Sequence, residues 1–122
     1  MVTSRHDTDA FLPLPAGMYH VLLALGGEVL HGYGIIQSFE ALTGGADTLL
    51  PGSLYAILAR MATIGLVEEV DPPSAEPSGG PPRRYYRMTA LGRAVARAES
   101  ARQARLLEVA HARGLAPQGH RR

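Results

Sequence analysis

The feature that most limits the possible folds is a series of three short helical patterns, each of which stops at glycine. The first covers residues 15–27, opens with a proline suited to a first helical turn, and ends on two glycines. The second, HGYGIIQSFEALTGG at residues 31–45, also ends on two glycines. The third starts at Pro51 and stops at Gly65. The sequence therefore predicts three short helices before residue 66.

Each pattern carries apolar residues at intervals of three and four, which is the spacing of one buried helix face. The face of the first helix is widened by Tyr19 and Leu23, which indicates contacts on two sides, one of them with another subunit. The residues expected on the three faces are Met18, Val21, Leu22 and Leu25; Tyr33, Ile36, Phe39 and either Leu42 or Ile35; and Leu54, Ile57, Leu58, Met61 and Ile64.

Two strands are predicted after the third helix. Residues 66–71, LVEEVD, alternate between apolar and polar side chains, and residues 84–88, RYYRM, return after a Pro/Gly-rich loop at 72–82. Tyr85 and Tyr86 must point to opposite faces of the second strand. The sequence leaves open which of the two belongs to the core.

A final helix is expected from Thr89, a suitable N-cap residue, to about Gly114. At 122 residues the chain is one domain, mostly α with a small β-hairpin. The order of elements predicts a winged helix-turn-helix plus a long C-terminal dimerisation helix. The expected parts are a flexible N-terminal tail at 1–14, a winged helix-turn-helix DNA-binding domain at 15–88, the dimerisation helix at 89–114 and a flexible tail at 115–122. A narrow apolar stripe along the last helix comprises Leu91, Val95, Ala98, Ala101, Ala104 and Leu107.

Charge is divided unevenly along the chain. Residues 1–82 hold two arginines and nine acidic residues, whereas residues 83–122 hold ten arginines and two acidic residues. There is no lysine, and the planar fork of arginine suits phosphates and guanine edges. This asymmetry points to an anionic partner, and a solvated basic helix is an equally good explanation of the charge alone.

The third helix has a low outer face, which a helix needs if its backbone is to approach base edges in the major groove. Ala56, Ala59 and Thr63 form the floor of that face. The predicted reading residues are Ser53, Tyr55, Ala56 and Arg60. In isolation, an ordinary solvent-facing surface explains the same residues better, and the neighbouring helices and basic hairpin favour DNA.

Arg83 and Arg84 come at the turn of the predicted wing. There they are expected to contact a phosphate backbone or a minor groove of double-stranded DNA. The alternative is that the two charges keep an exposed edge strand soluble.

Other chemistry finds little support in the sequence. The absence of cysteine excludes disulfides, thiolate catalysis and zinc–thiolate sites. The five histidines lack metal-site spacing, and neither a Ser/His/Asp motif nor a phosphate-binding loop is present. We therefore expect no enzyme activity, no metal and no cofactor. With no apolar signal-peptide core and no membrane span, the expected location is the cytoplasm.

Three blocks together resemble PadR-type transcriptional regulators: HGYGI (31–35), PGSLYAILARMATIGLV (51–67) and RRYYRMTALG (83–92). The resemblance covers residues 16–112. It implies a homodimer built on the C-terminal helix, a near-palindromic operator and a response to a small ligand or stress signal. The chain departs from the family pattern at Ala56, where proline is usual, and it has no tryptophan for an indole-lined drug pocket.

The leading hypothesis is a homodimeric repressor that binds DNA and responds to a small apolar or aromatic effector, with Tyr19 as the candidate effector contact. The alternative is a dimeric winged-helix adaptor that binds a protein partner. The predicted dimerisation residues are Met18, Leu22, Leu91, Val95, Ala98 and Leu107.

Overall fold

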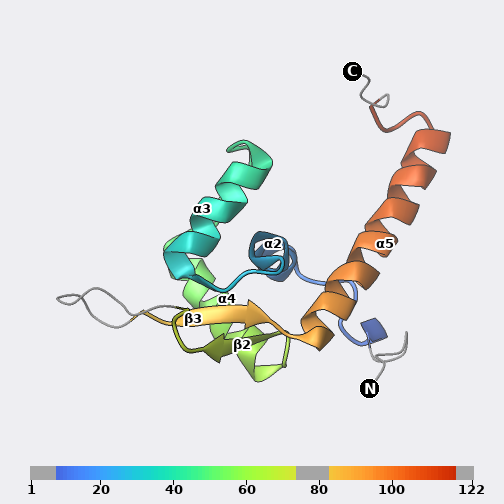
Figure 1. Cartoon of the computed structure of the whole chain (residues 1–122). Helices are drawn as coiled ribbons and strands as arrows, with labels where there is room; N and C mark the ends of the chain where they lie inside the picture. The colour runs from blue at the N-terminus through green and yellow to red at the C-terminus, as the bar shows by residue number, and fades with distance from the viewer. Residues whose placement is uncertain (1–7, 74–82, 118–122) are drawn as a thin grey trace.

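The computed structural model of the chain describes residues 8–73 and 83–117. It confirms the predicted class, which is mostly helical with a small antiparallel sheet and a long last helix (Figure 1). The helices are α2 (Ala16–Leu25), α3 (Gly32–Thr43), α4 (Pro51–Thr63) and α5 (Ala90–Ala112), and the strands are β1 (Leu30–His31), β2 (Val67–Val70) and β3 (Tyr85–Met88).

The wing is a three-stranded sheet rather than a two-stranded hairpin. Its strand order is β1-β3-β2, and both pairs are antiparallel. In β1, which lies just before α3, Leu30 pairs with Tyr86 and His31 with Tyr85. A strand of two residues is too short to show an alternating pattern, so β1 could not be predicted from the sequence. Its consequence is that the start of α3 is attached directly to the wing.

The core lies where α2, α3 and α4 meet beside the sheet. Leu54, Leu58 and Met61 are fully buried, which confirms the predicted inner face of α4. The open question about the two tyrosines is also answered: Tyr86 is buried in the core, and Tyr85 is half-buried. The inner face of α4 is thus fixed, and its opposite face is left to solvent.

The junction between the sheet and α5 is locked by hydrogen bonds. The predicted N-cap is confirmed, because the Thr89 hydroxyl accepts from the Gly92 amide at 2.9 Å. The same hydroxyl donates to the Gly65 carbonyl oxygen at 2.6 Å, and the Thr89 amide donates to the Leu66 carbonyl oxygen at 3.1 Å. The turn after α4 and the start of α5 are therefore one connected unit.

Residues 8–14, which the sequence assigned to an N-terminal tail, pack on the domain instead. Thr8 and Leu14 are buried, and Phe11 and Leu12 lie against the core. The apolar side chains of this segment pack against the core. The sequence could not predict this packing, because the segment has neither helical nor strand periodicity. The other residues of the assigned tail, 1–7, lie outside the described residues, as do 118–122 of the C-terminal tail.

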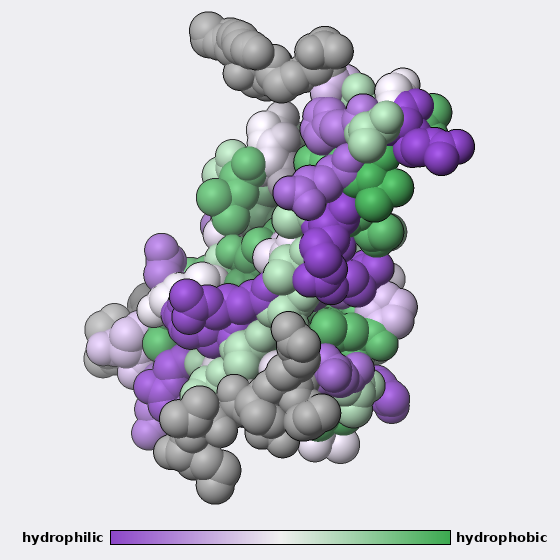
Figure 2. Space-filling model, turned by 90° about the vertical axis from the view of Figure 1, so that its right-hand side faces the viewer, coloured by the Kyte–Doolittle hydropathy of each residue, from purple (hydrophilic) through white to green (hydrophobic). Residues whose placement is uncertain are grey.

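The two halves of α5 differ in their surroundings. The first half packs on its own chain, whereas the second half rises away from the domain (Figure 1). Leu106, Leu107 and Val109 are all more than half exposed there. Figure 2 shows apolar surface on this half, next to a hydrophilic stripe.

This division corrects part of the predicted dimer surface. Met18, Leu22 and Val95 are buried in the core of the single chain, so their contacts are made within it. Leu91 and Ala98 are half-buried, and Leu107 is exposed. The dimer prediction was wrong for these residues because an apolar helix face can pack on its own domain or on a second copy. The sequence pattern is the same in both cases.

Candidate nucleic-acid interface

The outer face of α4 carries the residues that the sequence assigned to reading. Ser53, Tyr55, Ala56 and Arg60 are all exposed, on the sides of the helix away from its buried residues. Between them lie only short side chains. Thr63, at the end of this face, donates its hydroxyl to the Ala59 carbonyl oxygen at 3.0 Å and so lies close to its own helix. The face is therefore low along its centre, as a helix in a major groove requires.

Tyr55 is held by the start of α3. A Cβ atom placed on Gly32 would lie 2.6 Å from the Tyr55 hydroxyl oxygen and 2.9 Å from two ring carbons. The tyrosine ring therefore lies against the bare glycine backbone, and any larger residue at position 32 would displace it. The two residues belong to separate sequence motifs, so sequence reasoning did not connect them.

The wing arginines are available to a ligand. Arg83 and Arg84 precede β3, are exposed, and form no ion pair with any residue that the structure describes. Arg87 differs, because its guanidinium pairs with Glu68 across the sheet at 2.8 Å. The loop tip at 74–82, part of the predicted wing, lies outside the described residues.

Arg83 also reaches the start of α3. Its Nη1 atom lies 3.0 Å from Nε2 of His31. Residues from α4 and the wing, Tyr55 and Arg83, are thus brought to the same helix end. Arg60 and Ser53 stay on the surface of α4 itself.

Comparison with known proteins agrees with this architecture. Residues 21–98, from α2 to the first half of α5, match the model of the transcriptional regulator PadR-like family. The chain belongs to this family.

Solved structures of PadR proteins share the fold. The PadR-like transcription factor from Bacteroides fragilis is 28% identical, with a TM-score of 0.63 over 77% of this chain and 85% of that one. A PadR family regulator from Clostridium difficile is 22% identical, with a TM-score of 0.65 over 80% of this chain and 96% of that one. Bacillus subtilis PadR in complex with operator DNA is 16% identical, with a TM-score of 0.53 over 85% of this chain and 49% of that one. No curated protein matches the chain.

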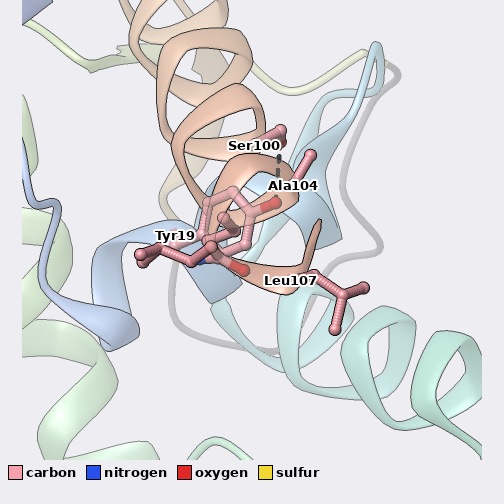
Figure 3. A pocket seen from close by; sticks show the side chains of 6 residues that line it. Tyr19, Ser100, Ala104 and Leu107 are labelled. Atoms are coloured by element: carbon pink, nitrogen blue, oxygen red, sulfur yellow. Dashed lines mark hydrogen bonds between the residues drawn. The ribbon is translucent and has the colours of Figure 1, made fainter. Parts of the chain in front are cut away.

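In this PadR-like chain, Tyr19 lies in a shallow groove between α2 and the second half of α5, the half that rises away from the domain. The groove has a volume of about 500 Å³ and is open to solvent (Figure 3). The Tyr19 hydroxyl is within hydrogen-bond distance, 2.7 Å, of the Ser100 hydroxyl. The groove is lined by Tyr19, Ser100, Gln103, Ala104, Leu106 and Leu107. The candidate effector contact therefore sits beside the exposed apolar half of α5.

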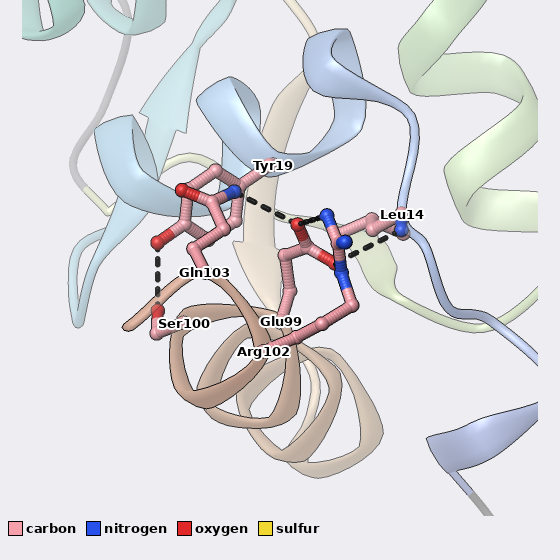
Figure 4. A network of polar contacts seen from close by, with 6 residues as sticks. All are labelled: Leu14, Tyr19, Glu99, Ser100, Arg102 and Gln103. Atoms are coloured by element: carbon pink, nitrogen blue, oxygen red, sulfur yellow. Dashed lines mark hydrogen bonds and ion pairs between the residues drawn. The ribbon is translucent and has the colours of Figure 1, made fainter. Parts of the chain in front are cut away.

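A buried carboxylate holds the PadR-like α5 in place. Glu99, which is 1% exposed, accepts from the backbone amide of Leu14 at 3.0 Å and from the side-chain amide of Gln103 at 2.8 Å (Figure 4). The Arg102 guanidinium donates to both carboxylate oxygens, at 2.9 and 2.6 Å. The hydrogen bond from Arg102, helped by those from Gln103 and Leu14, outweighs burial and lowers the pKa of Glu99 to about 2. This network joins the N-terminal segment to α5.

Metal sites and membrane-spanning helices were also sought in the described part of this PadR-like chain. Within residues 8–73 and 83–117, no three His, Asp or Glu side chains are grouped so that they could hold a metal ion. No helix in those ranges is long and apolar enough to cross a membrane.

Proposed function

We propose that this protein is a cytoplasmic, homodimeric transcriptional repressor that binds a near-palindromic operator in duplex DNA. The observation that carries the proposal is the exposed, low outer face of α4 beside two wing arginines, Arg83 and Arg84, that have no acidic partner in the described chain. Family membership supports it, since PadR-like proteins are transcriptional regulators. The operator complex of Bacillus subtilis PadR supports it through the shared fold.

Affinity and selectivity would come from different groups. Arg83 and Arg84 would contact phosphates, together with the backbone amides of the first turn of α4, which no side chain caps. Tyr55 and Arg60 flank the low centre of α4 and would reach base edges. Ser53 and Ala56 complete the proposed reading surface.

The proposed dimer contact is formed by the second half of α5, which its own domain does not cover. The side of α5 that packs on its own domain at Val95 and Glu99 continues along the helix to Leu106, where the domain no longer covers it. Leu107 lies next to Leu106 on the helix surface and is also half exposed. A second copy would bury this surface, and a small apolar or aromatic effector in the Tyr19 groove would then lie at the subunit boundary.

The proposal is tested by selecting randomised duplex DNA against the purified protein. The selected sequence and a scrambled control are then titrated at two salt concentrations. We expect a palindromic selected sequence with selective, salt-sensitive binding. If neither duplex bound at low salt, repression through this face would be excluded.

Replacing both wing arginines, Arg83→Ala/Arg84→Ala, is expected to weaken binding of any duplex by on the order of tenfold per arginine, because each loses a phosphate contact. The slope of log affinity against log salt should decrease by about 0.9 per lost contact. Fluorescence anisotropy titrations at several salt concentrations measure both quantities. The control is Arg97→Ala/Arg105→Ala, which removes the same charge from α5. An unchanged slope in the wing variant would contradict the assignment of Arg83 and Arg84.

Replacing Leu107 by glutamate is expected to weaken self-association by about tenfold or more, because a charge enters the proposed apolar contact of α5. Sedimentation equilibrium gives the dimer dissociation constant. Ala90→Glu is the matched control, because Ala90 is also exposed on α5 but lies at the opposite end of the helix, in the half that packs on its own chain. Equal dimerisation of the wild type and Leu107→Glu would argue against this surface.

An adaptor that binds a protein remains the second candidate. The exposed Glu68 and Glu69 on β2 and the single arginine of α4 favour it, because they reduce the positive charge that faces the proposed DNA. An adaptor predicts no salt-sensitive binding of duplex DNA by the wild-type protein, so the titrations above separate the two functions.

A further inference from the structure

His31 occupies an unusual position at the start of α3. Its Nδ1 atom accepts a hydrogen bond from the Gly34 amide at 3.0 Å, so the ring is the N-cap of the helix. The ring also meets Tyr85 edge-on, with centroids 5.3 Å apart and an interplanar angle of 75°. Two contacts therefore fix the direction in which Nε2 points.

The cap also fixes which nitrogen carries the proton. A backbone amide only donates, so Nδ1 of His31 must have a free lone pair to accept from Gly34. A neutral imidazole then carries its proton on Nε2. The alternative tautomer would turn an N–H of the ring toward the amide of Gly34 and leave α3 without its cap. Nε2 of His31 is therefore a hydrogen-bond donor.

A second donor lies beside this one. Arg83 Nη1 lies 3.0 Å from Nε2 of His31, and a guanidinium has no acceptor. The two N–H groups cannot bond to each other, yet they occupy one small region of the surface. Neither Arg83 nor His31 forms an ion pair with a carboxylate in the part of the chain described here. A single anionic oxygen beside both nitrogens would satisfy both donors.

We propose that His31 and Arg83 jointly hold one backbone phosphate of duplex DNA. The Nε2–H of His31 and the guanidinium of Arg83 each donate to the phosphate oxygens. This inference rests on the proposed DNA-binding function and adds to it a contact from His31, the β1 residue that caps α3, which is outside α4 and outside the predicted wing residues Arg83 and Arg84.

The location of the pair favours a nucleic-acid phosphate. It lies at the end of α3 against which Tyr55 of α4 is packed, so the same helix end touches both the proposed reading surface and the wing. Phosphate contacts at this junction would fix how deeply α4 enters the groove. The structural role of the cap and the binding role use different nitrogens of one ring, so they are compatible.

The decisive variant is His31→Asn. Asparagine is a good N-cap residue, so its side-chain oxygen can replace Nδ1 and keep α3 intact, but it is too short to place a donor beside Arg83. Its thermal unfolding is expected to match that of the wild type. Its affinity for the selected operator duplex is expected to fall about tenfold, because a hydrogen bond to a charged phosphate is lost.

The contacted phosphate is located with operator duplexes in which one phosphate at a time is replaced by a neutral methylphosphonate. We expect one position at which the replacement weakens the wild type but has little effect on His31→Asn or Arg83→Ala. The double variant is expected to bind no more than about twofold more weakly than Arg83→Ala, because the partners share one ligand.

The outcomes separate the two levels of the proposal. If the wild type binds no duplex, the proposed function fails and the phosphate site fails with it. If the wild type binds and His31→Asn binds equally well, only the phosphate site is overturned. If the two variants lose sensitivity at different phosphates, joint binding is overturned and separate contacts replace it.

Discussion

Replacing Gly92 by alanine is expected to lower the free energy of unfolding by about 3 kcal/mol, although alanine is the better helix former. A Cβ atom at this position would lie 2.1 Å from the carbonyl oxygen of Leu66 and 3.0 Å from its carbonyl carbon. Both are backbone atoms, which cannot rotate away as the end of a side chain can. The start of α5 or the turn after α4 must therefore move.

Any such movement breaks the junction between the sheet and α5. The Leu66 oxygen that a Cβ atom at Gly92 would strike already accepts from the Thr89 amide at 3.1 Å. The Gly92 amide is itself part of the cap, because it donates to the Thr89 hydroxyl. The clash therefore costs hydrogen bonds as well as packing, and this cost exceeds the gain in helix propensity of up to about 1 kcal/mol.

Thermal and urea unfolding measure the effect, and a fall in the melting temperature of about 10 °C is expected. Gly52→Ala is the matched control, because Gly52 is also helical and nothing lies within 4 Å of its Cβ position. The control should be neutral or more stable by up to about 1 kcal/mol. If Gly92→Ala were as stable as Gly52→Ala, the close approach to Leu66 would be wrong.

Much of the fold could be predicted from local signals in the sequence. The spacing of Leu54, Leu58 and Met61 indicated the inner face of α4, and the hydroxyl of Thr89 indicated the start of α5. Both signals depend on residues within a few positions of one another. They were confirmed because short helices and caps are determined locally.

The features that the sequence did not reveal depend on contacts between distant residues. Glu99 reads as one more charged residue on an exposed helix, yet it is buried because Leu14, 85 residues away, supplies an amide. The candidate site divides in the same way. The exposure of Tyr55 and Arg60 could be predicted from helix geometry. The contact between His31 and Arg83, which are 52 residues apart, could be recognised only in the folded structure.

Replacing Glu99 by glutamine is expected to destabilise the protein by about 2 kcal/mol at pH 7. Glutamine can still accept from the Leu14 amide, but its own amide group would face donors of Arg102 and Gln103. Arg102 is partly exposed, so water compensates some of the loss and keeps the cost below that of a fully buried charge. Because Glu99 links α5 to the N-terminal segment through Leu14, the variant should also bind the operator less tightly if α5 forms the dimer.

The effect of this replacement should depend on pH in a defined direction. The folded-state pKa of Glu99, about 2, lies below its ordinary value of 4.5, so folding favours the charged form. The stability that Glu99 contributes is therefore complete above about pH 4.5 and is lost as the pH falls toward 2. The difference in unfolding free energy between wild type and Glu99→Gln should shrink across that range.

Urea unfolding of both proteins between pH 2.5 and 7 tests this dependence, with Glu68→Gln as the control. Glu68 also pairs with an arginine, Arg87, but both side chains are about half exposed, so its replacement should cost well under 1 kcal/mol at every pH. A pH-independent difference for Glu99→Gln would mean that the carboxylate is not held in its charged form by the network.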